Sequence, residues 1–158
     1  MKTLFSRYLR CLVPSTTIPQ SLLLLVLRLY WGWQFFLAGK GKLMDLEKPA
    51  AFFQSLGIPL PYAQAILVGA TECFGGLLLL VGFCARLISL PLTILLSVAY
   101  LTADFDRAKA IFSDPDKFVT ADEFLFLLVV VIVLLFGPGK VSVDWLIKRK
   151  APTSSESA

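Results

Sequence analysis

The sequence predicts an all-α integral membrane protein: a four-helix bundle preceded by an amphipathic helix that lies in the membrane interface. Apolar residues make up 57% of the 158 residues and charged residues only 16%, against roughly 45–50% and about 25% in soluble domains. Four apolar stretches also follow one another, at about 20–38, 62–83, 86–103 and 120–136. A bilayer core about 30 Å thick needs around 20 helical residues. The first two stretches meet that length, and the last two are slightly short.

The segments around these stretches indicate one membrane domain over residues 20–147. Residues 1–19 include a run that is amphipathic at helical spacing, which is typical of a helix lying in the interface. A cleaved signal peptide is the competing interpretation, but no small-x-small cleavage site follows. The connection after the first stretch predicts a short surface helix stopped by Gly57, with Pro59 beyond it. Residues 148–158 form a tail that is first basic and then polar, and we expect its residues 151–158 to be disordered.

The distribution of Lys and Arg predicts that both termini are cytoplasmic. With four spans, the two termini and the middle connection share one side of the membrane and carry eight basic residues, whereas the other side carries six. Cytoplasmic segments carry the excess of Lys and Arg in membrane proteins. The bias is modest. A compact chain with basic ends suits a bacterial inner (plasma) membrane.

Composition excludes several classes of function. The net charge is +4, but the basic residues sit at the ends and in the loops without a basic stripe, so no nucleic-acid partner is expected. The sequence contains no histidine, which excludes His-ligated haem and most zinc or copper sites. We therefore predict no metal site. The three cysteines form no CxxC pair and suit the role of small apolar fillers.

Arg28 and Glu72 are charges placed inside apolar stretches, where each costs about 2.5–3.5 kcal/mol on insertion scales. Counted from the ends of two antiparallel helices, the two residues lie at similar depth, within one helical turn. An Arg–carboxylate pair satisfies most of the hydrogen bonds of both groups. We therefore predict a buried ion pair between Arg28 and Glu72.

Glycines surround both charges at helical spacing. Small residues let two membrane helices approach closely, as a buried pair requires. We expect the first two helices to meet along these close-packing glycines: Gly32, Gly39, Gly69, Gly75 and Gly76.

Two interpretations of the ion pair stay open. In the first, the pair is structural and fixes the register of two apolar helices. In the second, it lines a site for a polar headgroup, a quinone or a proton path. Tyr100, Asp104, Asp122 and Glu123 are a weaker candidate, a vestibule at the outer mouth, because acids at a helix–water boundary are usually just solvated.

A series of short motifs runs along the chain in a fixed order. The first apolar stretch carries Arg28-x-x-x-Gly32 and closes with Ala38-Gly39-x-x-Lys42-Leu43-Met44-Asp45, and the loop after it has Phe53-x-x-Leu56-Gly57-Ile58-Pro59. The second stretch carries Glu72-x-x-Gly75-Gly76, then Gly82-x-x-x-Arg86. The chain then closes with Gly137-Pro138-Gly139-Lys140-x-Ser142-x-Asp144. Over about residues 22–146, this ordered set resembles the DoxX family of membrane proteins.

The resemblance implies a four-helix membrane bundle in which Lys42, Arg86, Gly137, Gly139 and Asp144 are family-motif residues. DoxX-like proteins are subunits of quinone-linked oxidoreductases or belong to membrane complexes that handle oxidative or thiol stress. The resemblance therefore implies a non-catalytic membrane subunit or anchor of such a redox system, with quinone as the candidate cofactor and a protein partner in the membrane. A small-solute transporter and a structural or cargo-binding scaffold are the alternatives. The sequence does not decide whether the chain is a homo-oligomer.

Overall fold

The computed structural model describes residues 18–102, 105–109, 114–119 and 122–150, and this part of the chain is helical without a strand. The predicted all-α class is confirmed. The segment predicted as an interfacial helix, residues 1–13, and the predicted disordered tail, residues 151–158, lie outside the described residues. The four long helices are α2 (Ile18–Met44), α4 (Pro61–Val81), α5 (Ala85–Thr102) and α8 (Asp122–Phe136). The short helices are α3 (Glu47–Ser55), α6 (Phe105–Lys109), α7 (Pro115–Val119) and α9 (Val143–Lys150).

Helices α2, α4 and α5 are long and apolar enough to cross a membrane, with 27, 21 and 18 residues. Only 28–33% of the residues in their apolar windows are buried inside the protein, so most of their apolar surface is left for contact with lipid. Helix α8 is the predicted fourth span, but its 15 described residues give only about 22 Å of helix. The chain is an integral membrane protein in which the described part of the fourth apolar helix is shorter than a bilayer core is thick.

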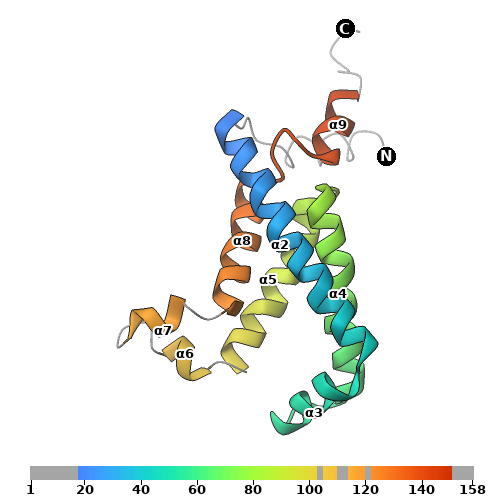
Figure 1. Ribbon diagram of the computed structural model, residues 1–158, viewed down its shortest axis with the longest axis vertical. Coiled ribbons are helices and arrows are strands. Elements are labelled where there is room, and N and C mark those ends of the chain that lie inside the picture. Colours follow the sequence, from blue (N-terminus) through green and yellow to red (C-terminus); the bar gives the residue numbers. More distant parts are fainter. Residues whose placement is uncertain (1–17, 103–104, 110–113, 120–121, 151–158) are drawn as a thin grey trace, which may run out of the picture.

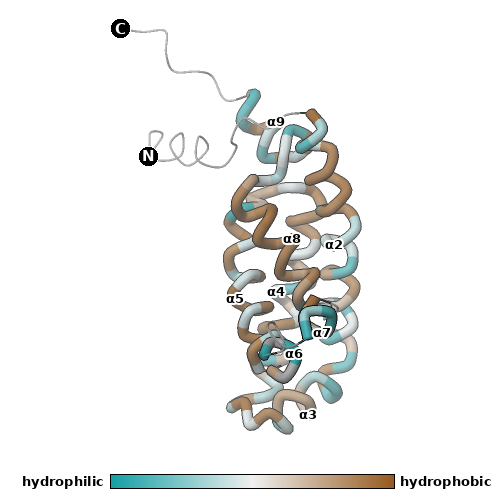
Figure 2. The backbone as a smooth tube through the Cα atoms, turned by 90° about the vertical axis from the view of Figure 1, so that its left-hand side faces the viewer, coloured by the Kyte–Doolittle hydropathy of each residue, from teal (hydrophilic) through white to brown (hydrophobic). Residues whose placement is uncertain are grey.

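The four long helices form one bundle in which α2 packs along α4 and α5 packs along α8 (Figure 1). Residues 82–84 join α4 to α5 directly, which makes these helices antiparallel neighbours, as the sequence predicts. Helix α3 covers one end of the bundle, and α9 lies at the opposite end, which is also the end at which α2 starts. We call these the α3 end and the α9 end. Figure 2 shows a hydrophobic α8 between hydrophilic segments in α9 and in α6 and α7.

The core lies where all four long helices meet. Its buried members are Phe35 from α2, Leu79 from α4, Ala85, Leu92 and Leu96 from α5, and Val130 and Val133 from α8. The ring of Phe35 also packs edge-to-face on Phe126, with ring centroids 4.6 Å apart. This cluster fixes the mutual positions of the helices that carry the candidate sites.

The predicted surface helix after the first span is α3, and it ends as expected at Gly57. Gly57 has a φ of +71°, and its N–H donates to the carbonyl of Gln54 while Ile58 N–H donates to Phe53, both at 3.0 Å. These two bonds cap the last carbonyls of the helix. The chain is thereby turned back over the α3 end and into α4.

Glycines let the backbones of α2 and α4 touch. A Cβ added at Gly39 would lie 2.6 Å from the carbonyl oxygen of Gly69, and one added at Gly76 would lie 2.7 Å from that of Gly32. These four glycines therefore lie in the α2–α4 contact. Gly75 lies elsewhere, because a Cβ there would meet the side chain of Leu92 on α5 at 3.1 Å.

Candidate functional site

Glu72 forms an ion pair with Lys42 between α4 and α2. The Glu72 side chain is only 8% exposed, and its Oε2 atom accepts a hydrogen bond from Lys42 Nζ. Lys42 lies in the last turn of α2, and its side chain is 32% exposed. A cation at the C-terminal end of a helix is also favoured by the helix dipole. The pair thus places a buried carboxylate beside a lysine that reaches the surface.

Arg28 has different partners at the other end of the bundle. Its side chain is fully buried, and its Nη2 atom donates to the carbonyl oxygen of Val141 while Nε donates to that of Leu24 at 3.4 Å. Within the described residues, Nη1 has no hydrogen-bond partner. The predicted pairing of Arg28 with Glu72 is therefore wrong.

The prediction failed because it aligned the ends of two helices that end at different levels. Gly32 packs on Gly76 and Leu80. One helical turn before Gly32, Arg28 therefore lies against Gly82, the residue that follows α4. The first ten residues of α2 thus run beyond the end of α4. By the same register, Gly39 packs on Gly69 and Cys73, and the next turn of α2 brings Lys42 to Glu72.

The closing motif ties the α8–α9 connection to the α4–α5 connection. The two carboxylate oxygens of Asp144 accept from the backbone N–H groups of Cys84 and Ala85, at 2.8 and 3.0 Å. The N–H of Asp144 in turn donates to the carbonyl of Gly82 at 3.1 Å. A carboxylate at the N-terminus of a helix satisfies free N–H groups and complements the dipole. Asp144 therefore caps α5 from a distant part of the chain.

The other motif residues near Asp144 also hold the α9 end together. Arg86 Nη2 donates to the carbonyl of Leu135 at 2.7 Å. Gly137 and Gly139 both have a φ of +79°, a backbone conformation that glycine adopts without steric cost. Ser142 Oγ accepts from the N–H of Trp145 at 3.2 Å and so caps α9. Arg86, Gly137, Gly139 and Asp144 thus form a structural junction, far from Lys42.

Cys84 is part of this junction and is poorly suited to redox chemistry. Burial of the thiol and then the negative charge of Asp144 raise the pKa of Cys84 above its usual value. A thiol is a nucleophile only as its thiolate. Cys84 is therefore held in its unreactive protonated form at neutral pH.

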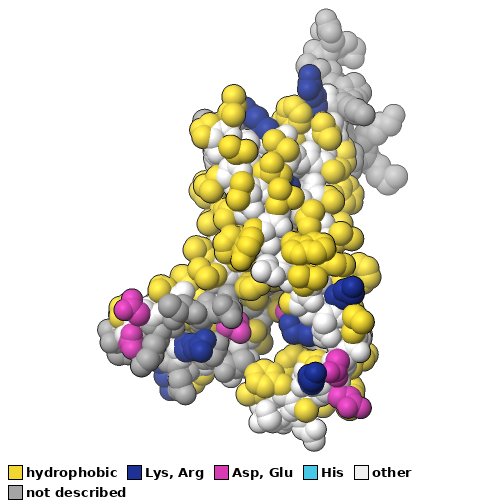
Figure 3. All heavy atoms as spheres, viewed as in Figure 1, with side chains coloured by type: hydrophobic (Ala, Val, Ile, Leu, Met, Phe, Trp, Pro, Cys, Tyr) yellow, Lys and Arg dark blue, Asp and Glu magenta, His cyan; other side chains and the backbone are white. Residues whose placement is uncertain are grey.

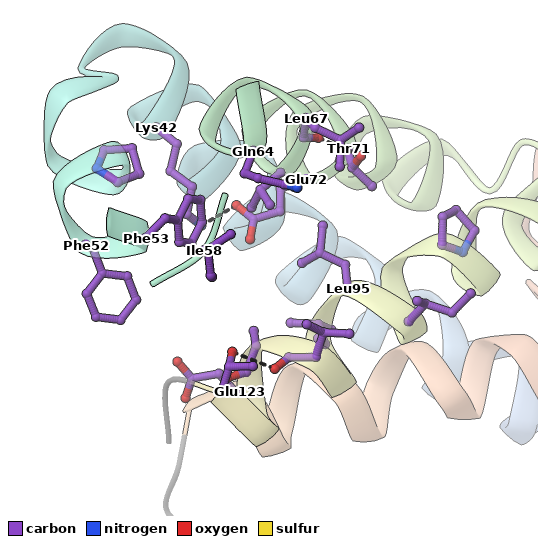
Figure 4. A pocket seen from close by; sticks show the side chains of 18 residues that line it. Lys42, Phe52, Phe53, Ile58, Gln64, Leu67, Thr71, Glu72, Leu95 and Glu123 are labelled. Carbon is purple, nitrogen blue, oxygen red and sulfur yellow. Dashed lines mark hydrogen bonds and ion pairs between the residues drawn. The ribbon is translucent and has the colours of Figure 1, made fainter. Parts of the chain in front are cut away.

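A cavity of about 930 Å³ opens beside the Lys42–Glu72 pair at the α3 end. Its walls come mainly from α3, α4 and α5, with Lys42 added by α2 and Glu123 by α8. Figure 4 shows Glu72 and Gln64 on one side facing Leu95 on the other. The lining is apolar apart from a few groups at one end and at the rim. Its polar members are Lys42, Gln64, Thr71, Glu72, Thr102 and Glu123, and its apolar members include Phe52, Phe53, Ile58, Leu67 and Leu95.

Two other regions are weaker candidates. A groove of about 390 Å³ on the outer face of α2 is lined by Val26, Leu29, Tyr30, Trp33 and Gln34. The vestibule suggested by the sequence is divided: Glu123 lines the large cavity, whereas Tyr100 is buried and donates to the carbonyl of Phe118 at 2.9 Å. Asp104 lies outside the described residues. Among the described residues, no group of three or more His, Cys, Asp or Glu side chains could hold a metal ion.

The cavity and the role of Lys42 were not predicted from the sequence. Lys42 was singled out only through the family motif, as part of a run that closes the first helix. The spacing of the glycines is the sequence signal that could have identified Glu72 as the partner of Lys42. Gly32 and Gly39 on one helix match Gly76 and Gly69 on the other when the helices are antiparallel, and this register sets Lys42 beside Glu72.

Comparison with known proteins agrees with this architecture. The sequence model of the DoxX family matches residues 23–104, just over half of the chain and including both Lys42 and Glu72. The chain belongs to the DoxX family. One relative, "Uncharacterized protein" of Haemophilus influenzae, is 30% identical over 84% of this chain and 87% of its own length.

A second relative carries a functional name. It is "Putative oxidoreductase CatD" of Bacillus subtilis, which is 28% identical over 85% of this chain and 93% of its own length. No solved structure matches the chain. The family membership of the chain therefore rests on sequence similarity.

Proposed function

We propose that this DoxX-family protein is a membrane subunit of a quinone-linked or thiol/oxidative-stress redox system, and that its cavity at the α3 end binds the quinone. The redox-active group that exchanges electrons with the quinone would belong to a partner protein in the membrane. The subunit itself positions the quinone and performs no chemistry of its own. The Bacillus relative with an oxidoreductase name is consistent with this role.

The observation that carries the proposal is an ion pair at the polar end of a mainly apolar cavity. Ligand sites typically combine a mainly apolar wall with a few placed polar groups. A quinone headgroup has two carbonyl acceptors, and Lys42 and Gln64 supply the hydrogen-bond donors. Glu72 supplies an acceptor for the hydroxyl groups of the reduced form. The residues present therefore fit both oxidation states of the ligand.

We further propose that the protein lies in a bacterial inner membrane with both termini in the cytoplasm. The α9 end, where α2 starts, would then face the cytoplasm, and the α3 end would face the opposite side. The Lys42–Glu72 pair would lie toward the outer surface of the membrane. A redox partner would accordingly dock at the α3 end, where charged side chains gather (Figure 3).

The test is gentle-detergent purification from native membranes, followed by solvent extraction and assay of quinone. We expect about one quinone per chain in the wild type and at least a tenfold loss in Lys42→Met and Glu72→Gln. Lys40→Met and Glu47→Gln are matched controls, because both residues are exposed at the same end of the bundle. These controls should keep the wild-type amount.

Absence of quinone from a folded wild-type preparation would refute the proposal. The Lys42–Glu72 pair would then be structural, and a scaffold that binds a cargo or partner protein would be the better account. Solute flux in liposomes that is lost in Glu72→Gln would instead favour a transporter. Equal quinone content in the site variants and the controls would place the quinone elsewhere on the protein.

A further inference from the structure

The cavity at the α3 end lies in a V-shaped gap between α4 and α5. The two helices are joined at the α9 end and diverge toward the α3 end (Figure 1). All lining residues of α5 come from Pro91 onward, and all lining residues of α4 come before Cys73. The gap thus occupies the half of each helix that is remote from their connection.

Pro91 lies at the start of this divergence. It sits inside α5, and proline has no N–H to donate to the carbonyl of Leu87, so a helix bends or loosens at this point. Helix α5 packs more extensively on α8 than on α4. The space left along α4 is not filled by another described helix.

The two ends of the cavity differ in chemistry and exposure. The polar end holds the Lys42–Glu72 pair under α3, with Phe52 and Phe53 of that helix in the wall. The rim along the helices is apolar and open: Leu67 on α4 is 61% exposed, and Ile94 and Val98 on α5 are 59% and 54% exposed. On spans that cross a membrane, exposed aliphatic side chains face hydrocarbon. The long side of the cavity therefore opens toward the bilayer.

We infer that the ligand of this cavity is a membrane-dissolved amphiphile that enters laterally between α4 and α5. Its acceptor-bearing headgroup binds at Lys42 and Glu72, and its apolar tail leaves through the opening between Leu67 and Ile94. This inference rests on the proposed binding at the same cavity, but it concerns the route and the tail rather than the redox role. A cavity of about 930 Å³ is near the upper end of ordinary ligand sites, roughly 300–1,000 Å³. It holds a headgroup and the first part of a tail, so a longer tail has to remain in the lipid.

The same chemistry has two sources, an isoprenoid quinone and a membrane lipid, and the experiment separates them. A reporter protein carries Phe53→Trp as its single tryptophan, with Trp31, Trp33 and Trp145 each replaced by phenylalanine. It is placed in lipid nanodiscs after its helical content has been checked by circular dichroism. Quenching of the reporter is measured with a long-tailed quinone, with a tail-less water-soluble quinone, and with phospholipids brominated on their acyl chains.

The opening is then narrowed with Leu67→Phe/Ile94→Phe. The matched control is Leu77→Phe/Leu90→Phe, since these residues are 48% and 52% exposed on the same two helices but do not line the cavity. We expect the narrowed variant to bind the long-tailed quinone at least tenfold more weakly and the tail-less quinone within twofold of the reporter protein. Quenching by brominated lipid should fall in the narrowed variant and stay unchanged in the control.

The outcomes distinguish lateral access from the quinone role. If neither quinone quenches the reporter but brominated lipid does so through the opening, lateral access stands for a lipid and the quinone role fails. If both quinones bind to the reporter protein, and the narrowed variant binds both as tightly as before or loses affinity for both equally, lateral access is overturned and the quinone role stands. Equal effects of the narrowed and control variants also overturn it.

Discussion

Replacing Gly82 with alanine should be among the most damaging small substitutions in this protein. Gly82 has a φ of +69° at the end of α4, and an added Cβ would lie 2.8 Å from Ser142 Cβ and 2.9 Å from Arg28 Cζ, with Arg28 Nη1 closer still. The backbone conformation alone costs an L-residue roughly 1–2 kcal/mol. Arg28 must also move, which breaks its hydrogen bond to Val141, and a bond to a charged donor contributes about 1.5–3 kcal/mol. The expected total is about 2.5–5 kcal/mol.

Alanine substitutions at two other glycines separate the cost of the backbone conformation from the cost of displacing Arg28. Gly57 has a φ of +71° but no atom within 4 Å of an added Cβ, so Gly57→Ala should cost only the conformational part, about 1–2 kcal/mol. Gly41 has neither a positive φ nor a neighbour within 4 Å, and alanine there should stabilise α2 by about 0.5–1 kcal/mol. The assay is the free energy of unfolding in mixed micelles, titrated with a denaturing detergent and followed by circular dichroism.

A double-mutant cycle measures how much of the destabilisation caused by Gly82→Ala depends on Arg28. In an Arg28→Met background, Gly82→Ala should lose at least about 1.5 kcal/mol of its effect, since neighbouring side chains couple by roughly 0.5–3 kcal/mol. If Gly82→Ala costs no more than Gly57→Ala, or if the cycle shows no coupling, the guanidinium does not lie against Gly82. The placement of the buried charge at the α9 end would then be refuted.

Three further predictions concern the ion pair, the helix seam and the junction. Lys42→Met should lower the free energy of unfolding by about 2–3 kcal/mol in the same titration, and by more than the double variant Lys42→Met/Glu72→Gln does, because the single variant leaves a buried carboxylate without its partner. Strong coupling of Glu72→Gln to Arg28→Met would instead contradict the observed pairing. Gly39→Ala should prevent α2 and α4 from packing, because its Cβ would meet the backbone of Gly69 and Cys73. Gly69→Ala should cost far less, because its Cβ would meet only side-chain atoms, those of Leu43 at 3.1 Å and Lys42 Cβ at 3.3 Å. Equal melting temperatures of the two variants would disprove this contact between the helices. In a Cys11→Ala/Cys73→Ala protein, Cys84 should reach half its maximal rate of reaction with maleimide at a higher pH than a free thiol does, because burial and Asp144 raise the pKa of the Cys84 thiol. A midpoint at or below the pH of a free thiol would show that the pKa of Cys84 is not raised.

The bundle was predictable because it depends on local properties of the chain. The apolar stretches and the Gly57 stop signal each act within one element, and each appears in the structure. Even so, the boundary of the first helix was placed at residue 38, whereas α2 continues to Met44. The difference matters because Lys42 lies in that extra length as a helical residue rather than in a loop.

The site was less predictable because it depends on how helices are offset along one another. Counting from predicted ends paired Arg28 with Glu72. In the structure Arg28 lies instead against Gly82, ten residues further along the chain, and Glu72 pairs with Lys42. The cavity depends on the divergence of α5 from α4 beyond Pro91, which no local pattern specifies. The cap that Asp144 places on α5 joins residues sixty positions apart and likewise has no local signal.

The most direct test of the cavity as a ligand site is photoaffinity labelling with a long-tailed azidoquinone, followed by mass spectrometry of the labelled peptides. We expect the label in α3 and in the lining halves of α4 and α5, at Phe52, Phe53, Leu67 or Leu95. Excess unlabelled quinone should compete the label away, and Glu72→Gln should reduce it at least tenfold. Label confined to the groove at Tyr30 and Trp33 on α2, or spread over all lipid-facing helices without competition, would contradict the assignment.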